Sequence, residues 1–154
     1  MNNQDTVSVL NELIQTSEDG KKGFSDAAEQ ATQQNLKTVF QGRSADCAGA
    51  ASELQALVGS LGGTAKDSGT VTGAALRGWG KVRAAFGDAD LALLDAAESA
   101  EDTAKAAYAT ALAGDLDAPI RAVVQRQNDG AVRNHDLIRN LRNDYKANAG
   151  HAVS

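Results

Sequence analysis

The strongest constraint on the fold of this chain is a 3.6-residue repeat of apolar side chains that runs through long, alanine-rich segments. The 154 residues include one proline, and aromatic side chains make up only 4%. Strands favour β-branched and aromatic residues, and an all-β chain needs frequent turns, so the composition favours helices. A chain of this length buries enough surface for one continuous core. We expect a single all-α domain over residues 1–154.

The repeat predicts four long helices, over about 6–33, 35–61, 89–113 and 118–147. Because the first connection is short, the first two helices should be antiparallel. Thr6 is the expected cap of the first helix. Gly20 and Gly23 within it each cost about 1 kcal/mol relative to alanine, which indicates a closely approaching neighbour. The pair Gly62-Gly63 should end the second helix.

Residues 62–88 differ from the rest of the chain because they begin with a polar, glycine-containing stretch. A short helix over about 73–86 is expected to follow it. A connection this long can cross the whole length of a bundle, so the helices on either side of it would be parallel. The sequence therefore predicts a four-helix bundle with a long crossover that contains a short extra helix.

Charge and cysteine content exclude several classes of partner. The formal net charge is −5, which argues against binding to nucleic acid or anionic lipid. No apolar stretch approaches the roughly 18 residues of a membrane span. With one cysteine and no basic, then apolar, start, we expect a cytoplasmic location. The six basic and three acidic side chains of 121–146 are spread around the helix, which favours a solvated surface over the alternative, an anion-binding stripe.

Several polar residues fall on or beside the apolar stripes of the predicted helices. They are Arg43, Glu98, Glu101, Lys105 and Gln127. An alanine face on the same helix as the two glutamates competes for the core, and Glu101 lies near the core on either choice. His135 lies on the flank of the last stripe. If the second and third long helices are parallel, Arg43, Glu98, Glu101 and His135 all lie at about 12–17 Å along the bundle, at one level.

Two interpretations of this layer remain open, because a charge in a helical core must be paired, hydrogen-bonded or metal-bound. In the first, Arg43 pairs bidentately with Glu101 or Glu98. In the second, Glu98, Glu101 and His135 bind iron or manganese. Bundle metal centres use a glutamate three residues before each histidine, and Val132 occupies that position here. We favour the ion pair, with no cofactor.

Catalytic arrangements are poorly supported. Cys47 lies on the core stripe and is expected to be a small buried hydrophobe rather than a nucleophile. His135 and Asp136 are not expected to act together, because adjacent helical side chains point about 100° apart. We identify no catalytic residue, and a non-enzymatic role is favoured.

Five stretches that span nearly the whole chain, 10–24, 53–63, 75–86, 97–112 and 126–144, carry a family resemblance. The residues involved are Asp19-Gly20, Gly23-Phe24, Arg77, Trp79, Glu101-Asp102, Tyr108, Gln127 and His135-Asp136. In their order and spacing the chain resembles uncharacterised bacterial ferritin-like four-helix-bundle proteins, a domain of unknown function. It departs from that pattern at Leu76, where a histidine is usual, and at Asp95, where a glutamate is common.

The resemblance implies a ferritin-like bundle but no assigned activity. We expect a non-enzymatic protein, associated with bacterial stress, that acts through a surface. Arg77, Trp79, Lys81 and Arg83 are the candidate partner surface, and the alternative is that Trp79 closes the bundle end. A homo-oligomer or another protein partner is compatible with the alanine-rich faces. The competing hypothesis is an iron or manganese protein, or an oxidoreductase, that uses the acids and His135.

Overall fold

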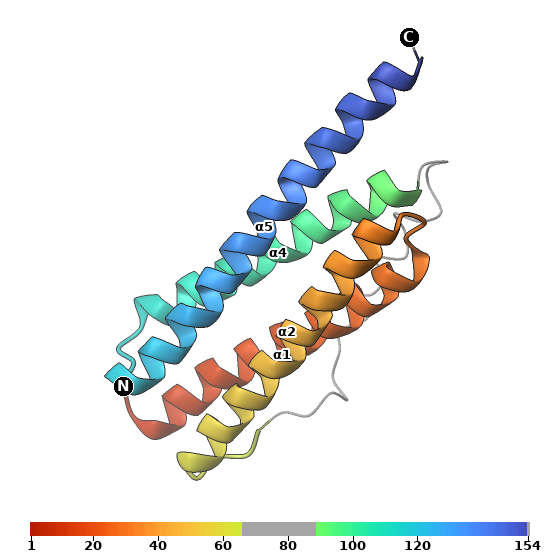
Figure 1. The fold of residues 1–154 in the computed structure, drawn as a ribbon. Helices are drawn as coiled ribbons and strands as arrows, with labels where there is room; N and C mark the ends of the chain where they lie inside the picture. The colour runs from red at the N-terminus through yellow and green to blue at the C-terminus, as the bar shows by residue number, and fades with distance from the viewer. Residues whose placement is uncertain (66–88, 154) are drawn as a thin grey trace.

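The computed structural model describes residues 1–65 and 89–153, and only the backbone of 148–153. Within this range the chain forms four α-helices and no strand, so the predicted all-α class is confirmed. The helices are α1 (Asn3–Gln30), α2 (Gln34–Ser60), α4 (Ala89–Ala113) and α5 (Ala118–Val153) (Figure 1). The predicted short helix at 73–86 lies outside the described residues, as does the partner surface of Arg77, Trp79, Lys81 and Arg83.

The helices form two antiparallel pairs, α1 with α2 and α4 with α5 (Figure 1). At one end of the bundle, Thr32 between α1 and α2 donates its backbone N–H and its hydroxyl to Asp90 of α4, at 2.8 and 2.6 Å. At the other end, the Asn11 amide of α1 donates to the Thr64 carbonyl, just beyond α2, at 3.1 Å. The starts of α2 and α4 therefore lie at the same end, and these two helices run in the same direction.

The helix ends differ from the predictions in two places. The cap of α1 is Asn2, whose side chain accepts the Asp5 N–H at 2.8 Å, while Thr6 is buried within the first turn. Helix α5 continues to Val153, beyond the predicted end at 147. The end of α2 is as predicted, because Gly62 takes a φ of +76°, a conformation that glycine adopts without strain.

The core consists of two apolar clusters, one toward each end of the bundle. One is built around Leu10, Leu13, Ile14, Leu54 and Val58, and the other around Phe24, Phe40, Leu93, Leu94 and Ile138. Buried polar side chains interrupt this core on all four described helices: Ser17 on α1, Arg43 on α2, Glu101 on α4 and His135 on α5. None of the described helices carries an apolar stretch long enough to cross a membrane.

Gly20 permits the close contact between α1 and α2 that its position predicts. A Cβ at Gly20 would lie only 2.9 Å from Cys47 Sγ, closer than such atoms normally approach. The neighbour is a side chain of α2, so glycine is needed here for packing. Cys47 is buried, and its surroundings are apolar on one side and polar on the other.

Candidate functional site

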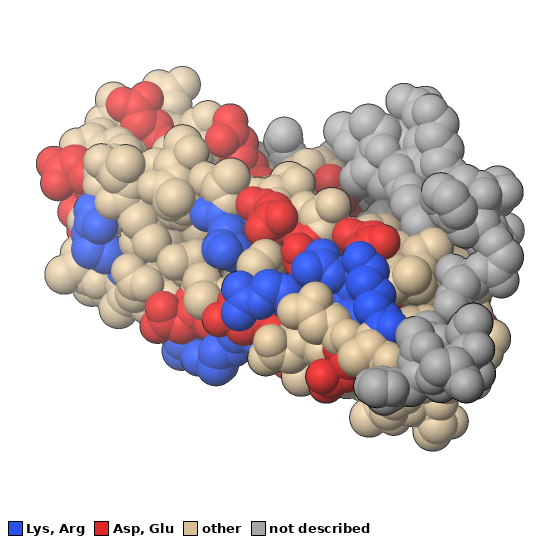
Figure 2. Space-filling view, turned by 90° about the horizontal axis from the view of Figure 1, so that it is seen from above, with Lys and Arg blue, Asp and Glu red and all other residues tan. Residues whose placement is uncertain are grey.

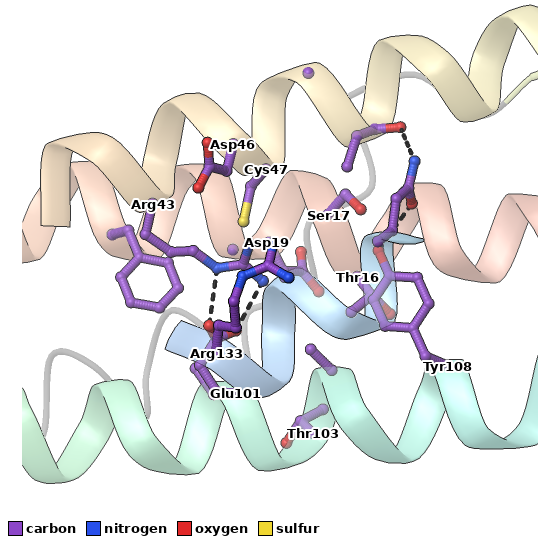
Figure 3. A pocket seen from close by; sticks show the side chains of 18 of the residues that line it. Thr16, Ser17, Asp19, Arg43, Asp46, Cys47, Glu101, Thr103, Tyr108 and Arg133 are labelled. Atoms are coloured by element: carbon purple, nitrogen blue, oxygen red, sulfur yellow. Dashed lines mark hydrogen bonds and ion pairs between the residues drawn. The ribbon is translucent and has the colours of Figure 1, made fainter. Parts of the chain in front are cut away.

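The centre of the bundle holds an ion pair between Arg43 of α2 and Glu101 of α4 (Figure 3). Arg43 Nε donates to Glu101 Oε2 at 2.8 Å, and Nη2 donates to Oε1 at 3.1 Å. Arg43 is 9% exposed and Glu101 is 1% exposed. Both follow the apolar repeat of their helices, since Phe40 and Cys47 are buried on α2 and Ala97 and Ala104 on α4. Of the two predicted partners of Arg43, the structure brings Glu101 into contact.

A third residue also forms a hydrogen bond with the Glu101 carboxylate. Asn134 of α5 donates its side-chain amide to Glu101 Oε2 at 2.7 Å. Burial raises the pKa of Glu101 above its ordinary value, although Arg43 and Asn134 both act to lower it. Burial alone would lower the pKa of Arg43, but Cys47 and Glu101 raise it, so the guanidinium stays charged. Sequence reasoning missed Asn134 because it lies beside the stripe of α5 and not on it.

A second set of polar contacts links α4, α5 and α2 about two helical turns along the bundle. The Tyr108 hydroxyl donates to Gln127 Oε1 at 2.9 Å, and Gln127 Nε2 donates to Glu53 Oε1 at 2.9 Å. Glu53 also pairs with Arg126. Burial raises the pKa of Tyr108. The partial burial of Glu53 acts to raise its pKa, but hydrogen bonds from Gln127 and Arg126 lower it overall. Gln127 was predicted in the polar layer, whereas Glu53 and Tyr108 were not.

Glu98 and Lys105 are not in the buried centre, contrary to the predicted layer. Glu98 is half-buried and forms an ion pair with Arg142, whose Nη1 lies 2.7 Å from Glu98 Oε2, instead of contacting Arg43. Lys105 is half-buried, and its charge acts on Asp136 of α5. The reason is the orientation of α4, whose alanine face is buried (Ala97, Ala104 and Ala111). Residues flanking that face point toward α5 or outward. These three alanines are buried within this chain.

The predicted metal ligands Glu98, Glu101 and His135 do not come together, because Arg43 and Asn134 already occupy Glu101. Glu98, Asp102 and His135 do, each with one candidate ligand atom within 4.8 Å of the others. Asp102 lies one turn after Glu98 on α4 and so shares its face. His135 itself is buried, at 8% exposed. The structure therefore replaces Glu101 with Asp102 in this candidate group.

The imidazole of His135 lies between two carboxylates. Nε2 is 2.9 Å from Asp102 Oδ1, and Nδ1 is 3.1 Å from Asp136 Oδ1. His135 and Asp136 are therefore in contact although adjacent helical side chains diverge by about 100°, since side-chain rotation brings the two groups together. The hydrogen bond with His135 lowers the pKa of Asp136.

A cavity of about 1000 Å³ passes among the four helices beside the Arg43–Glu101 pair (Figure 3). Its walls include small residues from several helices, such as Gly20, Ala50, Ala100 and Gly130. Arg43, Cys47, Glu101 and Tyr108 also line it. Burial raises the pKa of Cys47 to about 11, so the thiol is protonated at neutral pH. Alanine and glycine residues are compatible with such a cavity, but they occur as often at tightly packed contacts. The sequence therefore did not predict the cavity.

The outer surface carries both signs of charge. On the face in Figure 2, lysine and arginine side chains lie directly beside aspartate and glutamate side chains. Three of the described basic residues of α5 are in ion pairs: Arg126 with Glu53, Arg139 with Asp136 at 3.6 Å, and Arg142 with Glu98 and, at 3.8 Å, with Asp95. This agrees with the solvated, mixed surface expected for 121–146.

Residues 5–114 match the model of a family described as a domain of unknown function (DUF2383). The matched range includes Arg43 and Glu101 and ends before α5 begins. The inferred resemblance to an uncharacterised domain family is thus confirmed. No curated protein matches the chain.

Proposed function

This chain belongs to the DUF2383 family, and we propose that it is a non-enzymatic, ferritin-like four-helix bundle that works by binding. In this proposal the Arg43–Glu101 pair stands at the depth where a bundle of this type can hold a metal centre. The observation that carries it is the bidentate contact between two charged side chains that are both at least nine-tenths buried.

The donor chemistry of the central layer does not fit a dinuclear metal centre. Such centres use a glutamate from each of two helices and a Glu-x-x-His pair from each of the other two. Among residues 1–65 and 89–153, the carboxylate that contacts Arg43 in this layer is Glu101, whose oxygens accept from Arg43 and Asn134. The permanent positive charge of Arg43 also opposes a divalent cation at that point. The pair neutralises itself, which favours a structural role.

The reactive groups beside the cavity support the same proposal. The Cys47 thiol, with a pKa of about 11, is a poor nucleophile at neutral pH. The Tyr108 hydroxyl donates a hydrogen bond to Gln127, and burial raises the pKa of Tyr108 as well. What the arrangement offers is a cavity with fixed polar and charged walls, which is the property of a binding site.

Metal analysis tests the proposal. Untagged protein is incubated with ferrous iron or with manganese, separated from free metal, and analysed for bound metal. We expect less than a tenth of an equivalent at the central layer. Retention of one or two equivalents that the Glu101→Gln substitution abolishes would overturn the proposal, because Glu101 would then be a ligand.

A mononuclear site at Glu98, Asp102 and His135 is the second candidate, favoured by the 4.8 Å grouping of their ligand atoms. Carboxylate and imidazole donors suit iron and manganese. Arg142 competes for Glu98, at 2.7 Å. If this site binds, His135→Gln removes the retained metal, Arg142→Met increases it, and Glu101→Gln leaves it unchanged. The same assay thus separates the two candidates.

A further inference from the structure

Gly130 of α5 brings two guanidinium groups to one part of the cavity wall. A Cβ at this glycine would lie 3.7 Å from Arg133 Nη2 and 4.0 Å from Arg43 Nη1. Arg43, Arg133 and Gly130 all line the cavity, and Figure 3 shows the Arg133 side chain extending to Arg43. Because Gly130 has no side chain, the space between the two groups is open to the cavity.

Both groups have donors to spare. Arg43 uses Nε and Nη2 for Glu101, and its Nη1 has no partner among the described residues. Arg133 is exposed and forms no ion pair with a carboxylate of residues 1–65 or 89–153. A guanidinium presents five N–H donors in a fixed plane that matches a carboxylate. An acceptor placed at Gly130 would therefore meet donors from two directions.

We infer that this part of the cavity binds the carboxylate of a small organic acid, held between Arg43 Nη1 and Arg133. The inference rests on the proposed binding function and names the class of ligand. Bound in this way, the carboxylate would complete a row of alternating charge: Glu101, Arg43, the ligand and Arg133. Each neighbour in that row attracts the next, which is the arrangement a partly buried charge requires.

The charge and the walls of the cavity narrow the ligand further. Asp19, Asp46, Glu53 and Asp95 also line the cavity, and their negative charges oppose a doubly charged anion such as phosphate more strongly than a monocarboxylate. Small-molecule sites usually have about 300–1000 Å³ and largely apolar walls. Phe24, Ala50, Ala100 and Ala104 offer apolar wall beside the two arginines. A monocarboxylate with an apolar body of several carbons fits both features.

Calorimetric titration with octanoate and with 1-octanol tests whether binding depends on the negative charge of the ligand. The two probes share an apolar chain, and only octanoate can accept from the arginines. We expect octanoate to bind the full chain at least ten-fold more tightly than octanol. Arg133→Met, which keeps the length of an exposed side chain and removes its charge, should weaken octanoate ten-fold or more and leave octanol unchanged.

Gly130→Ala tests the position. The added methyl group would make only ordinary contacts, at 3.7 and 4.0 Å, and alanine favours the helix, so this variant should fold. The methyl would stand where the carboxylate is placed, so octanoate affinity should fall at least ten-fold. Gly42→Ala is the matched control, because a Cβ there meets nothing within 4 Å and Gly42 does not line the cavity. Its octanoate affinity should equal that of the unaltered chain.

Three results would overturn the inference: equal affinity for octanoate and octanol, unaltered octanoate binding in Arg133→Met and Gly130→Ala, or displacement of octanoate by an equal concentration of inorganic phosphate. None of these results changes the outcome of the metal analysis that tests the proposed function. Metal retention and its loss in Glu101→Gln are measured without Arg133 or Gly130, so the two failures are distinguishable.

Discussion

Two glutamates of α4 each pair with an arginine of another helix, at nearly the same N–O distance but with very different exposure to solvent. Arg43 Nε and Glu101 Oε2 are 2.8 Å apart, with side chains 9% and 2% exposed. Arg142 Nη1 and Glu98 Oε2 are 2.7 Å apart, with side chains 22% and 18% exposed. The first pair joins α2 to α4, across the two antiparallel helix pairs, and the second joins α4 to α5 within one of them. Distance alone therefore says little about how strongly each pair affects stability.

Removing one partner of the buried pair should have the largest effect. Arg43→Met leaves Glu101 as an unpaired buried carboxylate, which costs about 3–5 kcal/mol of unfolding free energy. The double variant Arg43→Met, Glu101→Leu should recover much of this loss, since apolar side chains often replace a buried ion pair without cost. Urea unfolding curves for the two single variants and the double variant measure both effects.

The double-mutant cycle also tests direct contact. If the losses of unfolding free energy in Arg43→Met and Glu101→Leu simply add in the double variant, the two charges do not stabilise one another. That result would contradict direct contact between Arg43 and Glu101. A coupling well above 0.5 kcal/mol is what contact predicts.

Packing at the same level can be tested without altering a charge. Gly20→Ala places a methyl group 2.9 Å from Cys47 Sγ, and the strain should exceed the gain in helix propensity, for a net loss of about 1–2 kcal/mol. Gly42→Ala, at an exposed helical position with free space, should instead be neutral or stabilising. In a Cys47→Ala background the penalty of Gly20→Ala should disappear. If it persists, the two helices do not approach at this contact.

The more exposed pair should matter least among these substitutions. Arg142→Met removes the partner of a glutamate whose side chain is 18% exposed but whose Oε2 is buried, so we expect a loss of about 1 kcal/mol, smaller than that of Arg43→Met. The measurement is the same urea unfolding. A loss as large as that of Arg43→Met would show that burial does not explain the difference between the two pairs.

The sequence predicted the fold and the buried pair because both follow from helical periodicity. The apolar repeat places Arg43 between Phe40 and Cys47, and only pairing makes a buried arginine tolerable. Glu101 was expected near the core on either choice of the α4 face, and it is buried. Glu98 and Lys105 were misplaced because periodicity alone left the rotation of an alanine-rich helix undecided.

Other features depend on distances that no single helix encodes. Asn134 reaches Glu101 only because α5 packs against α4 in one register. The group of Glu98, Asp102 and His135 depends on the same register. The pair of guanidinium groups at Gly130 forms only because Arg43, which is far from Gly130 in sequence, lies close to it in the folded chain.

The contributions of Glu101 and Glu53 to the free energy of unfolding should change with pH in opposite directions. The native pKa of Glu101 is raised by burial above its ordinary value of 4.5, so the native state binds more protons than the unfolded state just above that pH. Stability should therefore fall as pH rises above 4.5. The native pKa of Glu53 is lowered below 4.5 despite some burial, by hydrogen bonds from Gln127 and Arg126. Its stabilisation is present above 4.5 and is lost as pH falls below that value.

Unfolding free energies of the parent chain, Glu101→Gln and Glu53→Gln, measured from pH 3 to 7, separate the two contributions. The difference between the parent chain and Glu101→Gln should decrease as pH rises above 4.5. The difference between the parent chain and Glu53→Gln should increase as pH rises toward 4.5, and by less, because Glu53 is partly exposed and screened by solvent. If both differences increase with pH, pairing with Arg43 outweighs burial at Glu101, and the buried and exposed carboxylates differ only in degree.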